Sequence, residues 1–227
     1  MDMSKTSTFA TDKPSITIEE PAVNAIQTVT FEVDDTAAAE AFYAAAFDLG
    51  EDSWLRVRPA KDPSSGFRGF AVSLVVAQPG TVDSFTKTAL DAGATAIKGP
   101  EKNLWGYGAV LRDPFGNIWK IATSKKKDTA PVTREVESYN VGIGVADVAA
   151  TKQFYIDRGL TVAKSFGRKY VEFEAPGDTV SLSLYSRKFA AKTSFVSPEG
   201  DGSHRIVFGS DAGTFTDADG FAWESAA

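Results

Sequence analysis

The sequence has no cysteine and only one histidine, His204, among its 227 residues. Without cysteine the chain can form no disulfide, no thiolate nucleophile and no cysteine-ligated zinc or iron–sulfur site. One histidine is too few for a metal site with two or three His ligands, and a Ser-His-Asp triad could use only His204. These shortages exclude most hydrolase and metalloenzyme classes. The lack of cysteine also fits the reducing cytoplasm, which is the compartment we expect.

Long apolar runs and an excess of positive charge are missing as well. The longest strongly apolar run, residues 70–77, is far shorter than the roughly 20 residues that span a bilayer. Residues 1–15 are polar and lack the apolar centre of a signal peptide. The formal net charge of −6 gives no general attraction to the phosphates of nucleic acid. We therefore expect a soluble cytoplasmic protein that binds neither nucleic acid nor membrane.

What the sequence does contain is an internal repeat. The segment 33–43, VDDTAAAEAFY, recurs 112 residues later as 145–155, VADVAATKQFY. The segment 113–120, DPFGNIWK, recurs 104 residues later as 217–224, DADGFAWE, so the second copy is shorter inside. A charged, Pro-terminated stretch separates the copies and is typical of a linker. The predicted parts are an N-terminal extension (1–24), a first domain (25–123), a linker (124–136) and a shortened second domain (137–227).

Both copies follow the same local pattern. Alternation of apolar and polar residues predicts a strand at the start of each, 26–33 and 139–145. An Asp and an Ala-rich stretch follow each strand and predict helices over 36–47 and 148–158. The second copy has no room for a counterpart of the helix predicted over 82–92, so we expect it to be trimmed. Further strands are predicted at 55–58, 70–77, 106–112, 117–122, 169–174, 180–185 and 204–209.

This order of strand, Asp, helix with Phe-Tyr, glycine, further strands and an Asp-Pro-Phe-Gly-Asn turn resembles the vicinal oxygen chelate superfamily. That superfamily includes glyoxalase I, bleomycin- and fosfomycin-resistance proteins and extradiol dioxygenases. The resemblance covers residues 25–123 and 137–225 and rests on two ordered occurrences of both motifs. It implies an α+β fold of two tandem glyoxalase-like domains, built of βαβββ units whose curved mixed sheets surround clefts.

The resemblance also implies where the metal ligands of the family's enzymes would stand. Thr28 and Asn140 occupy the places of the first-strand His, and Lys120 occupies the place of the Glu after the turn. An ammonium has no lone pair for a metal, so copy one cannot form the usual site. Copy two keeps Glu224 and has His204 on a nearby strand, which makes two good ligands where catalytic sites commonly have three. We therefore expect neither a metal nor a cofactor.

Strand alternation predicts which side chains face the clefts, because neighbouring residues point to opposite faces. Guanidinium groups suit carboxylates or phosphates and a Trp face suits a planar ring, so the first cleft is expected to bind an anionic, partly aromatic small molecule. The same basic residues could instead form a solvated face paired with acids such as Glu32. The first cleft is expected to contain Thr28, Trp54, Arg56, Arg58 and Lys120.

The second cleft is predicted to be polar and mildly acidic. It is expected to contain Asn140, Tyr185, His204 and Glu224. In the first copy, Trp105 and Tyr107 lie in the glycine-flanked segment NLWGYG, just ahead of the hairpin strand. These two aromatic residues either form a lip over a pocket or pack at the rim of a barrel.

Three functions are compatible with these features. The first is a metal-free protein that binds a small molecule, as the resistance members of the superfamily do. The second is an enzyme centred on His204 and Glu224, either a metal-dependent lyase, isomerase or dioxygenase or an acid–base catalyst. The third is an interaction role without a ligand. A homodimer is also expected as one way to cover the surface that the missing helix leaves in the second copy.

Overall fold

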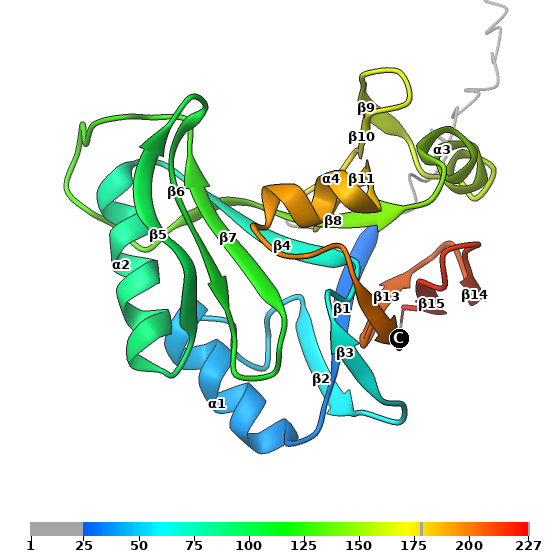
Figure 1. Ribbon diagram of the computed structural model, residues 1–227, viewed down its shortest axis with the longest axis horizontal. Coiled ribbons are helices and arrows are strands. Elements are labelled where there is room, and N and C mark those ends of the chain that lie inside the picture. The colour runs from blue at the N-terminus through cyan, green and yellow to red at the C-terminus, as the bar shows by residue number, and fades with distance from the viewer. Residues whose placement is uncertain (1–24, 178, 227) are drawn as a thin grey trace, which may run out of the picture.

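The computed structural model describes residues 25–177 and 179–226, so the predicted N-terminal extension lies outside the described residues (Figure 1). The fold is mixed α+β, as predicted. The helices are α1 (Thr36–Phe47), α2 (Pro79–Asp91), α3 (Val148–Ile156) and α4 (Arg187–Thr193). The strands are β1 (Ile26–Val33), β2 (Leu55–Pro59), β3 (Ser64–Gly66), β4 (Phe70–Val76), β5 (Thr95–Asn103), β6 (Gly106–Arg112), β7 (Ile118–Thr123), β8 (Val136–Val145), β9 (Val162–Ser165), β10 (Tyr170–Phe173), β11 (Ser181–Ser186), β12 (Gly200–Gly202), β13 (Ile206–Ser210), β14 (Phe215–Thr216) and β15 (Ala222–Ser225).

The repeated helices begin where the sequence predicts. Asp35 is the N-cap of α1, and its side chain accepts a hydrogen bond from the backbone N–H of Ala38 at 3.0 Å. Asp147 caps α3 in the same way. Each carboxylate satisfies backbone donors that the first helical turn leaves free. The Asp in each repeat therefore determines where its helix starts.

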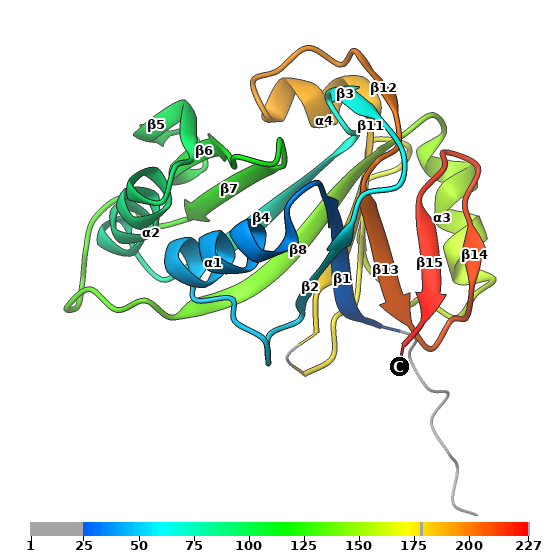
Figure 2. The same cartoon turned by 90° about the horizontal axis from the view of Figure 1, so that it is seen from below.

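Each large sheet combines strands from both repeats. The five-stranded sheet has the order β14-β15-β13-β1-β2, and the eight-stranded sheet has the order β5-β6-β7-β4-β8-β11-β10-β9. β1 pairs antiparallel with β13, and β4 pairs antiparallel with β8. Figure 2 shows β1 and β2 beside β13 and β15, apart from β5, β6 and β7. The first strands of copy one therefore share a sheet with the last strands of copy two.

The turn motif that recurs at 113–120 and 217–224 is hydrogen-bonded to the preceding helix of the same repeat. In copy one the Tyr43 hydroxyl donates to Asp113 at 2.8 Å, and the Trp119 indole N–H donates to the same carboxylate at 3.0 Å. In copy two the Tyr155 hydroxyl donates to Asp217 at 2.6 Å. Burial raises the pKa of Asp113, which the hydrogen bonds from Trp119 and Tyr43 oppose. These buried carboxylates explain why the Phe-Tyr and Asp-containing motifs recur together, because each supplies the other's hydrogen-bond partner.

Helix α4 shows that the prediction of no room for a helix at this point of the second copy was wrong, although α4 is shorter than α2; strand β5 was not predicted either. Helix α4 follows β11 as α2 follows β4, but it packs on the opposite face of the eight-stranded sheet (Figure 2). Ala190 and Ala191 of α4 are buried there against a small cluster that includes Ala71 and Val110. We name this surface the α4 face and the surface under α2 the α2 face. None of the helices in the described part of the chain has the length and apolar character that a membrane span requires.

Candidate functional site

A groove of about 780 Å³ lies on the α4 face, between α4 and the hairpin formed by β5 and β6. We call it the Lys120 groove. Its walls are mainly apolar, and one amine, that of Lys120 on β7, lies in its floor. The apolar lining side chains include Val75, Leu104, Trp105, Val110, Phe189 and Phe195.

Lys120 faces the groove because its neighbours on β7 face the core. Trp119 and Ile121 are fully buried on the α2 face, so strand alternation turns Lys120 to the α4 face, as the sequence predicts. Its Nζ donates to the hydroxyl of Thr193 on α4 at 2.9 Å. This bond crosses from β7 in the first repeat to α4 in the second. The position of the amine therefore depends on the pairing of the two repeats.

The Lys120 ammonium is desolvated without an opposite charge. Of the ion pairs between described residues, none includes Lys120. Burial alone lowers its pKa from 10.5 to about 8. The Lys120 ammonium has lost hydration water and has one hydroxyl as its hydrogen-bond partner. Groups in grooves whose pKa is shifted by desolvation commonly take part in function, so Lys120 is a candidate ligand-binding group.

Exposed aromatic side chains stand at the mouth of the groove. Trp105, at the tip of the β5–β6 hairpin, is 83% exposed, and its neighbour Leu104 is 80% exposed. Across the groove Phe195 is half exposed, and the Lys98 ammonium lies 4.2 Å from its ring centroid. Large apolar side chains gathered at one opening mark a binding surface more often than a solvated one. The predicted lip over a pocket therefore has a counterpart here in Trp105.

Tyr107 is not part of that lip. It points to the α2 face, where its hydroxyl donates to Asp83 of α2 at 2.8 Å. Burial and the Asp83 carboxylate raise the pKa of Tyr107 to about 12. Trp105 and Tyr107 point to different sides of the hairpin because Trp105 lies in the turn. Tyr107 lies in β6 and follows the alternation of that strand.

The predicted cluster of Arg56, Arg58 and Lys120 is wrong. β2 carries both arginines in the five-stranded sheet, whereas β7 carries Lys120 in the eight-stranded sheet. Arg56 folds back and donates to the backbone carbonyls of Ser53 and Leu55. The prediction assumed that strands of one repeat share a sheet, and strand pairing between the repeats separates them.

Arg58 is neutralised by two acids from different repeats. It pairs with Glu32 of β1 at 2.9 Å and with Glu224 of β15 at 2.7 Å. Thr28 belongs to the same sheet face, since β13 places Gly209 opposite both Thr28 and Glu224. One guanidinium between two carboxylates has no free positive charge to offer an anion. This surface therefore matches the other expectation, a solvated face whose basic residues pair with acids such as Glu32.

Trp54 is buried rather than placed on a cleft wall. It is only 9% exposed and packs against Tyr139 with ring centroids 5.0 Å apart. It precedes β2, outside the strand whose alternation was used to place it. The predicted combination of Trp54 with the arginines is therefore also wrong.

The structure does not bring His204 and Glu224 into one site. The two ring nitrogens of His204 face the backbone carbonyl oxygens of Arg68 and Asp219, and the ring stacks on Phe221 at 3.9 Å. Glu224 is held by Arg58. Within residues 25–177 and 179–226, no group of three or more His, Cys, Asp or Glu side chains is arranged to hold a metal ion. His204 thus connects the segment before β4 to the turn before β15.

Asn140 and Tyr185 lie on the α4 face beyond α4. The Asn140 amide donates to the hydroxyls of Ser181 at 2.7 Å and Ser183 at 2.9 Å. Tyr185 stacks on Phe189 of α4 with ring centroids 5.7 Å apart, and burial is the main cause of its raised pKa. These residues share a polar surface, as predicted, but His204 and Glu224 are not part of it.

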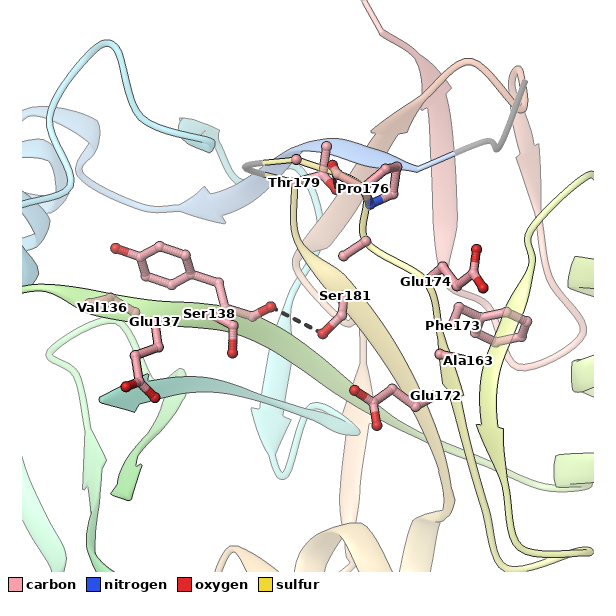
Figure 3. A pocket seen from close by; sticks show the side chains of 13 residues that line it. Val136, Glu137, Ser138, Ala163, Glu172, Phe173, Glu174, Pro176, Thr179 and Ser181 are labelled. Carbon is pink, nitrogen blue, oxygen red and sulfur yellow. Dashed lines mark hydrogen bonds between the residues drawn. The ribbon is translucent and has the colours of Figure 1, made fainter. Parts of the chain in front are cut away.

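A second, more polar pocket of about 590 Å³ opens next to that surface, beside the ends of the neighbouring strands β8, β11 and β10 (Figure 3). Its lining includes the carboxylates of Glu137, Glu172 and Glu174. Ser181 points into it and donates to the backbone carbonyl of Tyr139 at 3.1 Å. Glu172 already accepts hydrogen bonds from the Tyr170 hydroxyl and the Lys164 ammonium. This pocket is acidic, but none of the four residues predicted for the second cleft lines it.

Sequence reasoning missed Thr193, Phe189 and Phe195, which complete the Lys120 groove. All three come from α4 or from the turn that follows it. A signal existed, since Ser186 followed by RKFAAKT is an N-cap before helix-favouring residues. Even with the helix identified, its position over Lys120 would have required the pairing of the repeats.

Comparison with known proteins identifies the fold. No family model matches the sequence. Glyoxalase I from Zea mays superposes with a TM-score of 0.56 at 13% identity, covering 88% of this chain and 91% of that one. A variant of the same enzyme gives a TM-score of 0.57 at 12% identity, covering 88% and 92%. The chain therefore has the glyoxalase I fold over most of its length, and the predicted fold class is confirmed.

Two further likenesses are partial. A glyoxalase/bleomycin resistance protein/dioxygenase family enzyme from Burkholderia phytofirmans is 24% identical with a TM-score of 0.40, covering 44% of this chain and 98% of that one. The bifunctional protein GlmU of Lactobacillus gasseri and that of Lactobacillus johnsonii are each 26% identical over 107 residues, 41% of this chain. The chain spans 23% of the length of these two curated relatives. Neither likeness assigns a function.

Proposed function

We propose that this chain, which has the glyoxalase I fold, binds an anionic small molecule with an apolar or aromatic body in the Lys120 groove. The observation that carries the proposal is the Lys120 ammonium, which is desolvated, bonded to one hydroxyl and without a carboxylate partner among the described residues. A bound carboxylate, sulfonate or phosphate would supply the missing charge-assisted hydrogen bonds. Of the three residues in the predicted positive floor, Arg56, Arg58 and Lys120, only Lys120 belongs to this groove.

The walls of the groove support the apolar half of the proposed ligand. Trp105, Phe189 and Phe195 present ring surfaces around the opening, where a planar ligand ring could stack. Burying apolar surface stabilises a complex by roughly 25 cal/mol per Å². An anion with an aromatic body would thus use both parts of the groove, the amine for orientation and the rings for affinity.

Binding of this kind requires no metal. Among the described residues that line the groove, Glu101 is the one carboxylate, and it pairs with Lys98 at 2.7 Å. The alternative of a metal-dependent lyase, isomerase or dioxygenase relied on His204 and Glu224, whose side chains have separate partners. The geometry therefore favours a metal-free binding protein over that enzyme.

The proposal is tested by titrating the protein with anilinonaphthalene sulfonate, an aromatic anion whose fluorescence rises in apolar surroundings. We expect Lys120→Met to weaken binding about tenfold, because a hydrogen bond to a charged group contributes about 1.5 kcal/mol or more. The matched control is Lys192→Met, which removes an exposed amine from the rim of the same groove and should change affinity little. Equal affinity of the wild type and Lys120→Met, or loss of binding on addition of a chelator, would contradict the proposal.

A further inference from the structure

We propose that the Lys120 amine forms imines with aldehydes that enter the Lys120 groove, which makes it a covalent carbonyl-binding site. This inference deepens the proposed function, since it concerns the same groove and names a second class of ligand for it. It rests on three features of the structure: the hydrogen bonding of the amine, the access to it, and the apolar walls around it.

The hydrogen bonding at Lys120 leaves the nitrogen lone pair free. The Thr193 hydroxyl donates its own hydrogen to the backbone carbonyl of Ala190 at 3.1 Å, so towards Lys120 it can only accept. One N–H of the amine is therefore directed at Thr193. In the neutral amine the lone pair takes another direction, and no described residue donates a hydrogen bond to it. A nucleophilic nitrogen is thus held by one N–H bond without losing its reactive electron pair.

The surroundings of Lys120 favour the neutral amine at the same position. The partly buried side chain still lines an open groove, so a small ligand can reach it. In residues 25–177 and 179–226 no carboxylate forms an ion pair with Lys120 that would hold it as an ammonium. Desolvation, which lowers the pKa of Lys120 to about 8, increases the neutral fraction at pH 7 roughly 300-fold over that of an ordinary lysine. Desolvated amines of this kind are the ones that attack carbonyl groups in proteins.

The reaction balances without any further reactant. The neutral Lys120 nitrogen forms a bond to the aldehyde carbon while the carbon–oxygen π bond breaks, and one proton passes from the nitrogen to the oxygen, which gives a carbinolamine. The hydroxyl then leaves with the second proton of the nitrogen as water, and a carbon–nitrogen double bond remains. The apolar walls formed by Trp105, Phe189 and Phe195 favour this step, because they hold little water to reverse it. An aldehyde attached to an aromatic ring fits both the amine and the walls.

Pyridoxal phosphate is a suitable probe, since it combines an aromatic ring, an anion and an aldehyde. The protein is incubated with a limiting amount of it near pH 7, the imine is reduced with cyanoborohydride, and the labelled lysines are identified by peptide mass mapping. We expect Lys120 to be labelled at least about tenfold more than Lys192 or Lys98, the other two lysines that line the groove. Labelling that is spread evenly over exposed lysines would overturn the inference.

Variants separate this inference from the proposed function. Lys120→Arg keeps the positive charge but cannot form an imine, so it should retain binding of anilinonaphthalene sulfonate and lose the preferred label. Preferred labelling of Lys120 together with unchanged sulfonate binding in Lys120→Met would support the imine and contradict the anion site. Sulfonate binding that depends on Lys120, without preferred labelling of Lys120, would support the anion site and contradict the imine. Unfolding curves of both variants in urea check that each is folded.

Discussion

Replacing Lys120 by methionine should stabilise the protein at neutral pH. The folded state holds an ammonium away from water with one hydroxyl as its partner, whereas the unfolded chain solvates it fully. The pKa of Lys120 is about 8 in the folded state against 10.5 for an unperturbed lysine. A tenfold change in a protonation equilibrium is worth about 1.4 kcal/mol, so the charged form destabilises the folded state by about 3 kcal/mol. Methionine has a similar length and no charge to desolvate.

The pH dependence has a definite sign. Lys120 is a cationic group whose pKa is lowered on folding, so between pH 8 and 10.5 the unfolded state binds more protons than the folded state. The destabilisation is complete below pH 8 and disappears as the pH rises towards 10.5. The advantage of Lys120→Met should therefore shrink from about 3 kcal/mol at pH 7 to about 1 kcal/mol at pH 10.

Urea denaturation of the wild type and Lys120→Met at both pH values measures this difference, because the midpoint and slope give the free energy of unfolding. Lys192→Met serves as the control, since Lys192 is an exposed residue on the rim of the groove. Its difference from the wild type should be small and independent of pH. Two results would refute the view that burial of the Lys120 ammonium destabilises the folded state. One is a Lys120→Met variant that is less stable than the wild type at pH 7, and the other is a difference in the free energy of unfolding that stays constant up to pH 10.

The remaining predictions concern binding and the duplicated motif. The affinity for anilinonaphthalene sulfonate should fall about tenfold in total between pH 7 and pH 10 and then level off, because the Lys120 ammonium loses its proton near pH 8 and its charge contributes about that factor; a fluorescence titration that gives one dissociation constant at pH 7 and pH 10 would speak against the ion pair. Trp105→Ala should weaken the same binding and leave the free energy of unfolding within about 0.5 kcal/mol, since this side chain is 83% exposed; a large loss of stability in urea would show a structural role instead. Asp113→Asn should destabilise the fold by about 3 kcal/mol and Asp217→Asn by less, because one oxygen of Asp113 accepts from three side-chain groups and the equivalent oxygen of Asp217 accepts from one; thermal unfolding of the two variants compares them, and equal losses would contradict this account.

Local chemistry explains which elements were predictable. The N-caps at Asp35 and Asp147 and the alternation along β1 and β7 act over a few residues, so they are visible in the sequence. The face of β7 on which Lys120 lies was predictable for the same reason. α4 was missed because seven residues make a weak helical pattern. Homodimerisation, which was expected from the sequence, stays a prediction.

The composition of the candidate site was not predictable in this way. Lys120 was assigned to one cleft with Arg58, but β1 pairs with β13 of the second repeat, and β2, which pairs with β1, carries Arg58 in that other sheet. Thr193 and Phe195 reach Lys120 from more than 70 residues along the chain. Such contacts depend on long-range strand pairing, for which a single sequence holds no local signal.

By itself, the sequence determined the mixed α+β fold, the starts of α1 and α3, and the face on which Lys120 lies, because these follow from hydrogen bonds and side-chain periods within a few residues. Only the tertiary structure decided which charges meet. It placed Arg58 between two acids and left Lys120 under α4 without one, because ion pairing and desolvation depend on distances between segments that the pairing of the repeats brings together.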